Sequence, residues 1–127
     1  MSEADETPPD ADEQREEAML TAARSVVRTC MQVRPVESVL IITDPESSEL
    51  GRALYEATAR VTDRVLMMMM PPSHREGNEP PNPVADLMRR QDVVLMATKH
   101  SLTHTRARAN ASRENVRIAS LPGIDAE

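Results

Sequence analysis

Four short runs of apolar residues alternate along the chain with segments in which apolar residues recur every three or four positions. The runs cover residues 38–43, 64–70, 92–97 and 116–120, and their hydrophobicity is continuous rather than alternating. Continuous hydrophobicity over so few residues is typical of a strand covered on both faces, as in a parallel sheet. We therefore predict four parallel strands, one of which is a buried strand built largely from the methionines at 67–70.

The N-terminal part of the chain divides into a tail and a helix. Residues 1–12 are rich in acids and prolines with almost nothing to bury, which predicts a disordered acidic tail before an α/β domain over residues 13–127. Helical periodicity predicts a first helix from about Glu13 that ends before Pro35. Cys30 falls on the apolar face of this helix, so we expect a small core residue rather than a nucleophile.

The other gaps between strands also carry helical patterns. Asp44 and Pro45 are a good N-cap and first helical residue for a second helix, and we expect shorter helices over about 83–90 and 103–114. Strands that alternate with helices in this way indicate right-handed crossovers. The predicted fold class is α/β, a Rossmann-like open, mostly parallel sheet of about four strands with flanking helices. Its small size suggests an incomplete or N-terminal domain.

Charge and composition exclude several classes of function. The formal net charge is −6, but residues 1–17 hold eight acids against one arginine, a local charge of −7, so the remaining 110 residues sum to +1. A body with no basic field and one aromatic residue, Tyr55, predicts no nucleic-acid partner. No apolar run is long enough to span a membrane, so we expect no membrane association. A single cysteine favours a reducing compartment and predicts a cytoplasmic protein.

Ligands of open parallel sheets bind beyond the carboxyl ends of the strands. The turn after the first predicted strand contains no glycine, which excludes the glycine-rich loops that hold dinucleotides or nucleotide phosphates. We interpret Asp44 in this turn as a helix cap in preference to a general base or a ligand. We therefore expect no NAD or ATP from this architecture.

The turn after the third predicted strand holds the densest set of polar side chains. The candidate substrate-binding or anion-binding residues are Lys99, His100, Ser101, Thr103, His104 and Arg106. They would form an electropositive rim for a carboxylate or phosphate, helped by free amides at the start of the next helix. The structural alternative is that the hydroxyls cap this helix while the arginine faces solvent. Neither a third metal ligand nor an acid for a catalytic triad accompanies them, so we expect no catalytic residue and no metal bound by this chain.

Four segments together resemble a known family. Residues 39–44, 65–72, 101–108 and 118–124 are similar to the N-terminal domain of the M29 metalloaminopeptidases, the aminopeptidase T and leucyl aminopeptidase group. The most specific match is the Ser-Leu-Thr-His-Thr block that is followed later by Leu-Pro-Gly-Ile.

The resemblance implies part of a cytoplasmic metalloprotease. Such a hydrolase would remove N-terminal residues from peptides at a pair of divalent metal ions, and this chain would contribute cleft and assembly surface while being catalytically silent alone. The family's metal ligands belong to a C-terminal domain, so the implied partner is that metal-binding domain or a separate subunit. Two alternatives stay open: a standalone non-enzymatic module that binds a small anion or a partner protein, and the half-domain of a related metal-dependent ring-cleaving dioxygenase.

The sheet also predicts an association surface. An apolar strand edge that is left unpaired is a natural pairing site. We expect such an edge after Ser120, where a further strand or a second copy of the chain would bind.

Overall fold

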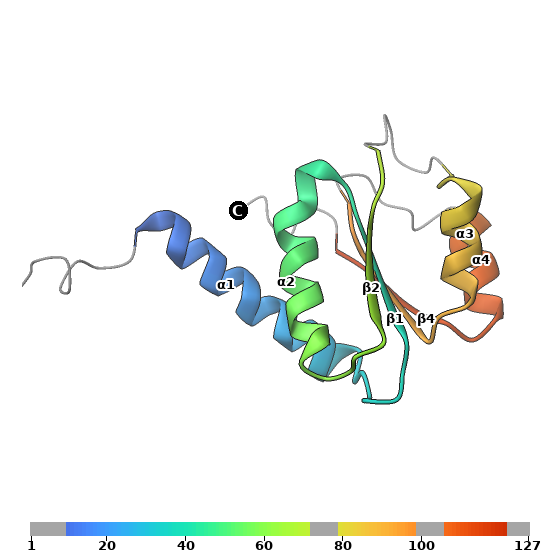
Figure 1. Ribbon diagram of the computed structural model, residues 1–127, viewed down its shortest axis with the longest axis horizontal. Helices are drawn as coiled ribbons and strands as arrows, with labels where there is room; N and C mark the ends of the chain where they lie inside the picture. Colours follow the sequence, from blue (N-terminus) through green and yellow to red (C-terminus); the bar gives the residue numbers. More distant parts are fainter. Residues whose placement is uncertain (1–9, 72–78, 99–105, 122–127) are drawn as a thin grey trace, which may run out of the picture.

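A computed structural model describes residues 10–71, 79–98 and 106–121 of the chain, and Figure 1 shows the arrangement. The strands are β1 (Val39–Thr43), β2 (Val65–Met69), β3 (Val93–Ala97) and β4 (Arg117–Ser120). The α-helices are α1 (Ala11–Ser25), α2 (Ser48–Ala59), α3 (Asn82–Arg89) and α4 (Arg106–Arg113). All strand pairs are parallel, which confirms the predicted α/β fold class with its Rossmann-like open sheet.

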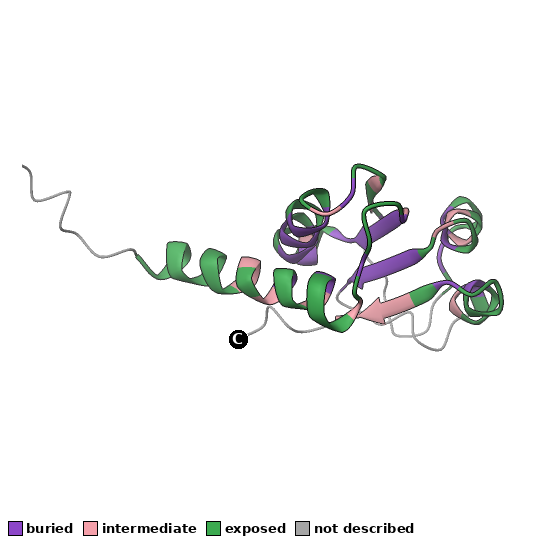
Figure 2. Ribbon diagram, turned by 90° about the horizontal axis from the view of Figure 1, so that it is seen from below, coloured by how far each residue is buried: buried purple, intermediate pink, exposed green. Residues whose placement is uncertain are grey.

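The strand order explains how the helices are divided between the two faces of the sheet. The order is β2-β1-β3-β4, so the chain moves to one side of β1 through α2 and then returns past β1 to β3 through α3. Right-handed crossovers in opposite directions place their helices on opposite faces. Accordingly α1 and α2 cover one face while α3 and α4 cover the other (Figures 1 and 2).

The core consists of two apolar layers that share the central strands. Successive residues of β1 alternate between them: Ile41 packs against α1 and α2, whereas Leu40 and Ile42 pack towards α3 and α4. Every residue of β1 and β3 is buried, as expected for strands covered on both faces (Figure 2). On α2 the buried apolar residues Leu50, Ala53, Leu54 and Ala57 follow the predicted helical spacing.

The second apolar run forms a strand, but the expectation that it is buried is wrong. β2 is an outer strand, and neither face of it is fully covered by a helix. Leu66 is 56% exposed, and the side chains of Met67 and Met69 are 41% and 54% exposed. Hydrophobic continuity alone does not distinguish an edge strand of this kind from a central one, because the neighbouring layers decide which strand is covered.

The helix boundaries differ from the prediction at the N-terminus. α1 begins at Ala11, two residues before the expected start, because Asp10 and Glu13 form a capping box in which each side chain accepts a hydrogen bond from the other's backbone amide. Residues 1–9, most of the predicted tail, lie outside the described residues. No helix within the described ranges is both long and apolar enough to cross a membrane.

Cys30 is exposed, so its predicted place in the core is wrong. The last turn of the first helical segment, Val26–Cys30, is a π-helix. Val27 in this segment is fully buried. The wider turn breaks the 3.6-residue spacing after Val27, so Cys30 no longer lies on the apolar face of the helix.

Candidate functional site at the carboxyl end of the sheet

The strand order places a topological switch point at the carboxyl ends of β1 and β3, the position where open parallel sheets usually bind ligands. The chain leaves β1 towards β2 on one side and resumes with β3 on the other, so the crossovers diverge at the carboxyl ends of β1 and β3. Thr43 and Ala97, the last residues of these strands, are paired in register. Asp44 and Thr98 therefore follow at neighbouring positions, and both are buried.

Asp44 acts as a helix cap, as the sequence predicted. Its carboxylate Oδ1 accepts a hydrogen bond of 2.9 Å from the backbone amide of Ser47, and Pro45 occupies the first position of the short 3-10 helix Pro45–Ser47. The Thr43 hydroxyl donates to the Asp44 carbonyl at 3.3 Å. Only 2% of Asp44 is exposed, so this end of β1 is a firmly packed floor rather than an open loop.

Gly51 allows α2 to approach this floor closely. A Cβ atom built on Gly51 would lie 2.7 Å from the Cβ and 2.8 Å from the Oγ1 of Thr43. No side chain fits at such distances without a shift of α2 away from β1. Sequence reasoning missed this residue, although a glycine within a helical segment of a chain that has only three glycines was an available signal.

Most of the predicted anion-binding residues cannot be placed. Lys99, His100, Ser101, Thr103 and His104 lie outside the described residues. Arg106 is the first residue of α4, and 89% of its side chain is exposed.

The expectation of free amides at the start of α4 is wrong. The Glu79 carboxylate accepts hydrogen bonds from the backbone amides of Arg106 at 2.7 Å and Ala107 at 3.2 Å. Its Oε2 also lies 4.0 Å from the Arg106 Nε. The protein thus supplies its own anion at this helix end, where backbone amides and the helix dipole favour negative charge. The two residues lie 27 positions apart, a separation at which sequence pattern gives no sign of contact.

The described residues do not fit a metal centre. No group of three or more His, Cys, Asp and Glu side chains that could hold an ion occurs within residues 10–71, 79–98 and 106–121. All three histidines of the chain, at positions 74, 100 and 104, fall in the undescribed segments.

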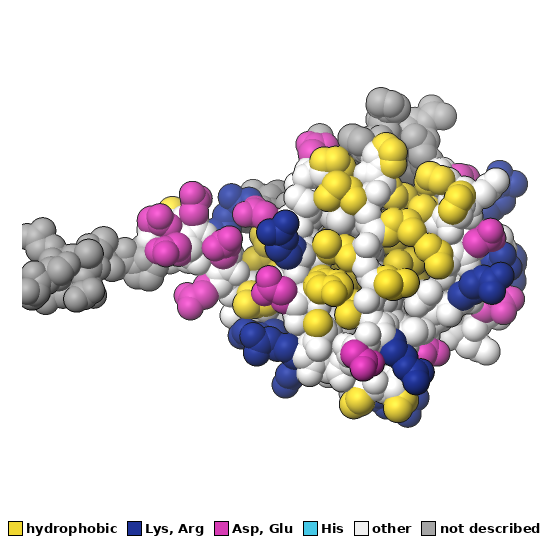
Figure 3. All heavy atoms as spheres, in the orientation of Figure 1, with side chains coloured by type: hydrophobic (Ala, Val, Ile, Leu, Met, Phe, Trp, Pro, Cys, Tyr) yellow, Lys and Arg dark blue, Asp and Glu magenta, His cyan; other side chains and the backbone are white. Residues whose placement is uncertain are grey.

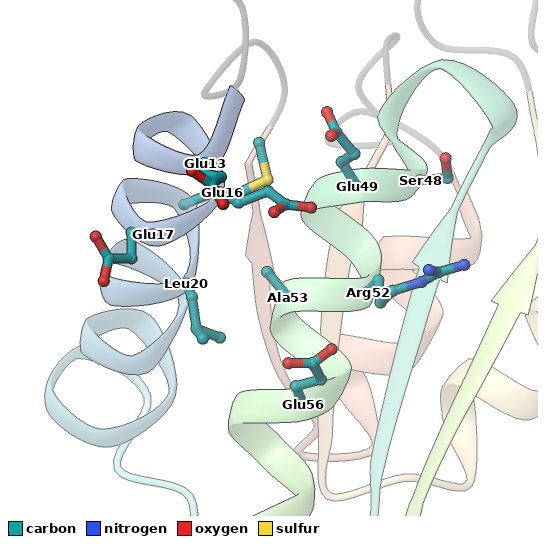
Figure 4. Close-up of a pocket in the computed structure, with 10 residues that line it drawn as sticks. Glu13, Glu16, Glu17, Leu20, Ser48, Glu49, Arg52, Ala53 and Glu56 are labelled. Atoms are coloured by element: carbon teal, nitrogen blue, oxygen red, sulfur yellow. The ribbon is translucent and has the colours of Figure 1, made fainter. Parts of the chain in front are cut away.

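A groove of about 490 Å³ lies between α1 and α2 on one face of the sheet (Figure 4). It is lined by Glu13, Glu16, Glu17, Met19, Leu20, Ser48, Glu49, Arg52, Ala53 and Glu56. Leu20 and Ala53 lie between the two helices, whereas Glu17 and Arg52 point away from the gap (Figure 4). Arg15 forms an ion pair of 2.9 Å with Glu49 that joins the two helices. Glu17 and Arg52 point away, Glu49 is already paired with Arg15, and the remaining charged groups are all carboxylates, so the groove lacks the mixed convergent polar groups of a ligand site.

A second hollow of about 550 Å³ lies between α3 and α4. Its charged side chains form bonds within their own helices, Arg89 to Asp86 at 2.7 Å and Arg113 to Asn110 at 2.6 Å. They cover the helix surfaces instead of pointing at a common ligand.

The amino end of the sheet carries an ion pair between the buried Glu37 and the half-exposed Arg117. Glu37, 4% exposed, accepts two hydrogen bonds from the Arg117 guanidinium at 2.8 and 2.9 Å, and Arg117 also donates to the carbonyl of Met31. These hydrogen bonds, against the opposing effect of burial, hold the pKa of Glu37 at about 2, below its usual 4.5. The same contact raises the pKa of Arg117.

Comparison with known proteins gives a structural neighbour. No protein-family model matches the chain, and no curated protein matches it at a significant level. A solved structure, 2,5-dihydroxypyridine dioxygenase from Pseudomonas putida KT2440, is similar with a TM-score of 0.66 and 16% sequence identity. The likeness covers 90% of this chain and 35% of the dioxygenase chain, so this protein spans about a third of that enzyme's length.

This likeness overturns the resemblance to M29 aminopeptidases. The structural neighbour is a dioxygenase, and no aminopeptidase match accompanies it, so the predicted leucyl aminopeptidase function is wrong. At 16% identity the shared feature is the fold, an open parallel α/β unit built like the matched part of a dihydroxypyridine dioxygenase.

Proposed function

We propose that this chain is the α/β half of a ring-cleaving dioxygenase that acts on a dihydroxylated pyridine or a similar ring diol. The observation that carries the proposal is the structural likeness to 2,5-dihydroxypyridine dioxygenase. It extends over 90% of the chain, well beyond a single strand-helix-strand unit. Because it covers 35% of the dioxygenase, we propose that catalysis is shared with a part that lies outside the matched region.

The role proposed for this chain is to form one wall of the substrate cleft. Asp44 and Thr98 make a packed floor at the carboxyl ends of β1 and β3, the usual ligand position in such sheets. The segment that follows Thr98 supplies cationic and hydroxyl groups: Lys99, His100, Ser101, Thr103, His104 and Arg106. We propose that they bind the anionic form of a ring diol. The charged side chains, and not the first amides of α4, would bind this anion, because the Glu79 carboxylate already accepts hydrogen bonds from the Arg106 and Ala107 amides.

The metal centre is proposed to come from elsewhere in the enzyme. Ring cleavage by dioxygen commonly uses a metal held by imidazole and carboxylate ligands. The described residues provide no such set, so no step of catalysis is assigned to them. A metal-binding domain or separate subunit is therefore the proposed partner. The single, exposed thiol of Cys30 suits a reducing compartment, so we propose the cytoplasm as its location.

Calorimetry with 2,5-dihydroxypyridine tests the proposed cleft. We expect the full chain to bind this probe, and Lys99→Ala to weaken binding by about tenfold, the effect of losing about 1.4 kcal/mol of interaction. Arg60→Ala is the matched control, because Arg60 ends α2 at the opposite end of the sheet, and it should bind normally. Absence of binding, or equal binding by Lys99→Ala, would overturn the proposed site.

Two further experiments distinguish the dioxygenase proposal from a non-enzymatic module that binds small anions. A plain anion-binding module would take inorganic phosphate as well as the ring diol, so tighter binding of phosphate would favour that module. An oxygen electrode tests shared catalysis: with Fe²⁺ and 2,5-dihydroxypyridine the chain alone should consume no oxygen. Turnover by the chain alone would contradict a metal centre supplied by another part.

A further inference from the structure

The exposed apolar side chains of this protein gather at one edge of the sheet. Five large hydrophobic residues are exposed among the described residues, and three of them belong to β2. They lie on both faces of the strand, because Leu66 pairs with Leu40 of one core layer and Met67 with Ile41 of the other. Figure 3 shows hydrophobic side chains on both sides of this strand, which faces the viewer in that orientation.

Tyr55 extends this surface onto α2. Ala53 lines the groove against α1, and two residues further on a helix turns by roughly 200°, so Tyr55 points to the side away from α1. That side faces β2, which α2 contacts directly. Tyr55 is 37% exposed and is the only aromatic residue in the chain. We call Tyr55, Leu66, Met67 and Met69 together the β2 surface.

Among the described strands, β2 has a neighbour on one side only. In the order β2-β1-β3-β4 it bonds only to β1 among the described strands. Soluble proteins usually protect such an edge with lysine, an inward-facing charge, a bulge or a short strand. β2 has none of these protections: all five residues from Val65 to Met69 are uncharged, and the ladder to β1 is regular along their whole length. The edge is therefore suited to pair with another strand.

β4 forms the other edge of the sheet, where we expected an apolar edge after Ser120, and its side chains are less exposed than those of β2. Its residues are half-buried except for Arg117, which is exposed but held by the Glu37 carboxylate and the Met31 carbonyl. The side chains at this edge are thus partly covered by the protein itself. Among the described residues, the more exposed apolar edge is therefore β2.

The distribution of charge around β2 favours a second copy of β2 as the strand that pairs with this edge. The nearest charged residue in sequence before β2 is Arg64, and Pro71 follows soon after its end. If a second β2 runs antiparallel with Met67 opposite Met67, each Arg64 lies at an opposite end of the ladder, facing uncharged residues. At about 3.4 Å per residue the two arginines are then about 20 Å apart, twice the Debye length at 0.1 M salt. The acidic start of α1 projects away from β2 and does not face it (Figure 1).

We propose that two copies of this chain associate through antiparallel pairing of their β2 strands, with a two-fold axis at Met67. A strand that is uncharged and apolar on both faces is complementary to itself. Each copy would supply backbone hydrogen-bond partners and apolar contacts to the outer edge of the other's β2. The pairing joins the two sheets into one and covers Leu66, Met67 and Met69, with the Tyr55 side chains on the α2 face. This dimer does not depend on the ligand proposed for the carboxyl end of the sheet.

Sedimentation equilibrium of the full chain tests the dimer. We expect a mass that rises towards that of a dimer with concentration, as mass action requires. Met67→Lys places two ammonium groups against each other at the axis and should give a monomer at every concentration. Thr21→Lys adds the same charge to an exposed position of α1 and should dimerise like the unmodified chain. A monomeric unmodified chain, or a dimer that Met67→Lys leaves unchanged, would overturn the proposal.

A cysteine cross-link tests the position of the axis and does not rely on a destabilising variant. Directly opposite residues of an antiparallel pair have Cα atoms about 4.5–5.5 Å apart, within the range of a disulfide. With Cys30 replaced by serine, Met67→Cys should oxidise rapidly to a covalent dimer under a mild oxidant. Thr21→Cys in the same background should not. If Met67→Cys stays monomeric on a non-reducing gel while its circular dichroism is native, the proposed axis is wrong.

Discussion

The two ends of the sheet are stabilised by different kinds of contact. At the amino end, contacts join residues far apart in sequence: Arg117 binds Glu37 across 80 positions, and the Ser38 amide donates to Asp92 at 2.9 Å. At the carboxyl end Asp44 caps its own helix and contacts Ser47, three residues away. The amino end therefore fixes the order of the strands. Among the described residues at the carboxyl end, the side-chain contacts are caps on backbone amides: Asp44 caps its own helix, and Glu79 caps the start of α4.

The largest expected effect of a single substitution is at the amino end. Arg117→Ala removes the main partner of the buried Glu37 carboxylate, and because Arg117 itself is 42% exposed the expected cost is about 2–3 kcal/mol. For a domain of this size that is a large part of the free energy of unfolding. Urea denaturation should show a lower midpoint with an unchanged slope. The exposed Arg60→Ala should unfold like the original chain, and equal midpoints for both variants would contradict the role of the ion pair.

Acid should weaken the same contact. Glu37 has a folded-state pKa of about 2 against an ordinary 4.5, so its contribution is fully present above pH 4.5 and is lost as the pH falls from 4.5 towards 2. The loss amounts to about 2 kcal/mol, a lower figure than the shift alone implies because water screens the half-exposed Arg117. Denaturation at several pH values measures it. Glu37→Gln should remove this part of the pH dependence, and the ion pair would be discounted if the dependence were unaltered.

At the carboxyl end the expected effect is smaller. Asp44→Ala removes the cap of the helix that follows β1, which costs about 1 kcal/mol. Asp44→Asn keeps an acceptor and should retain most of the stability. Thermal unfolding distinguishes them, and a loss of 3 kcal/mol or more in Asp44→Ala would show that this end also holds the sheet together.

The smallest expected effect is at the start of α4. Glu79→Ala removes the carboxylate that accepts from the Arg106 and Ala107 amides, and since this carboxylate is 40% exposed the cost is about 0.5 kcal/mol. The variant also frees two amides at the carboxyl end. Hydrogen exchange should therefore be faster at Arg106 and Ala107 while β1 is unaffected. Unchanged exchange at both amides would contradict the capping by Glu79.

Much of the fold could be predicted from the sequence because its determinants are local. The run at 38–43 predicts a strand covered on both faces, as β1 is, and Asp44 with Pro45 predicts the helix start that the structure contains. What could not be predicted depends on contacts between distant segments. The exposure of Met67 follows from strand order, and the cap by Glu79 from a loop that returns to α4. The exposure of Cys30 follows from a π-turn that changes the helical period.

The sequence predicted the position of the candidate site in less detail than it predicted the fold. The carboxyl end of the sheet was predicted as the ligand position from the strand pattern, and Asp44 lies there as expected. The predicted residues from Lys99 to His104 lie outside the described segments and stay a prediction. The family assignment rested on four short segments, whereas the structural likeness to the dioxygenase extends over 90% of the chain.

A nuclear magnetic resonance titration of the labelled chain with 2,5-dihydroxypyridine tests the central claim most directly, because it compares both ends of the sheet in one sample. Ligand binding at the carboxyl end should shift the backbone amides of Asp44, Thr98 and Arg106. The amides of Glu37 and Asp92 at the amino end should stay in place. Shifts confined to the amino end or to the groove between α1 and α2, or no shifts at all, would contradict a ligand site at the carboxyl end.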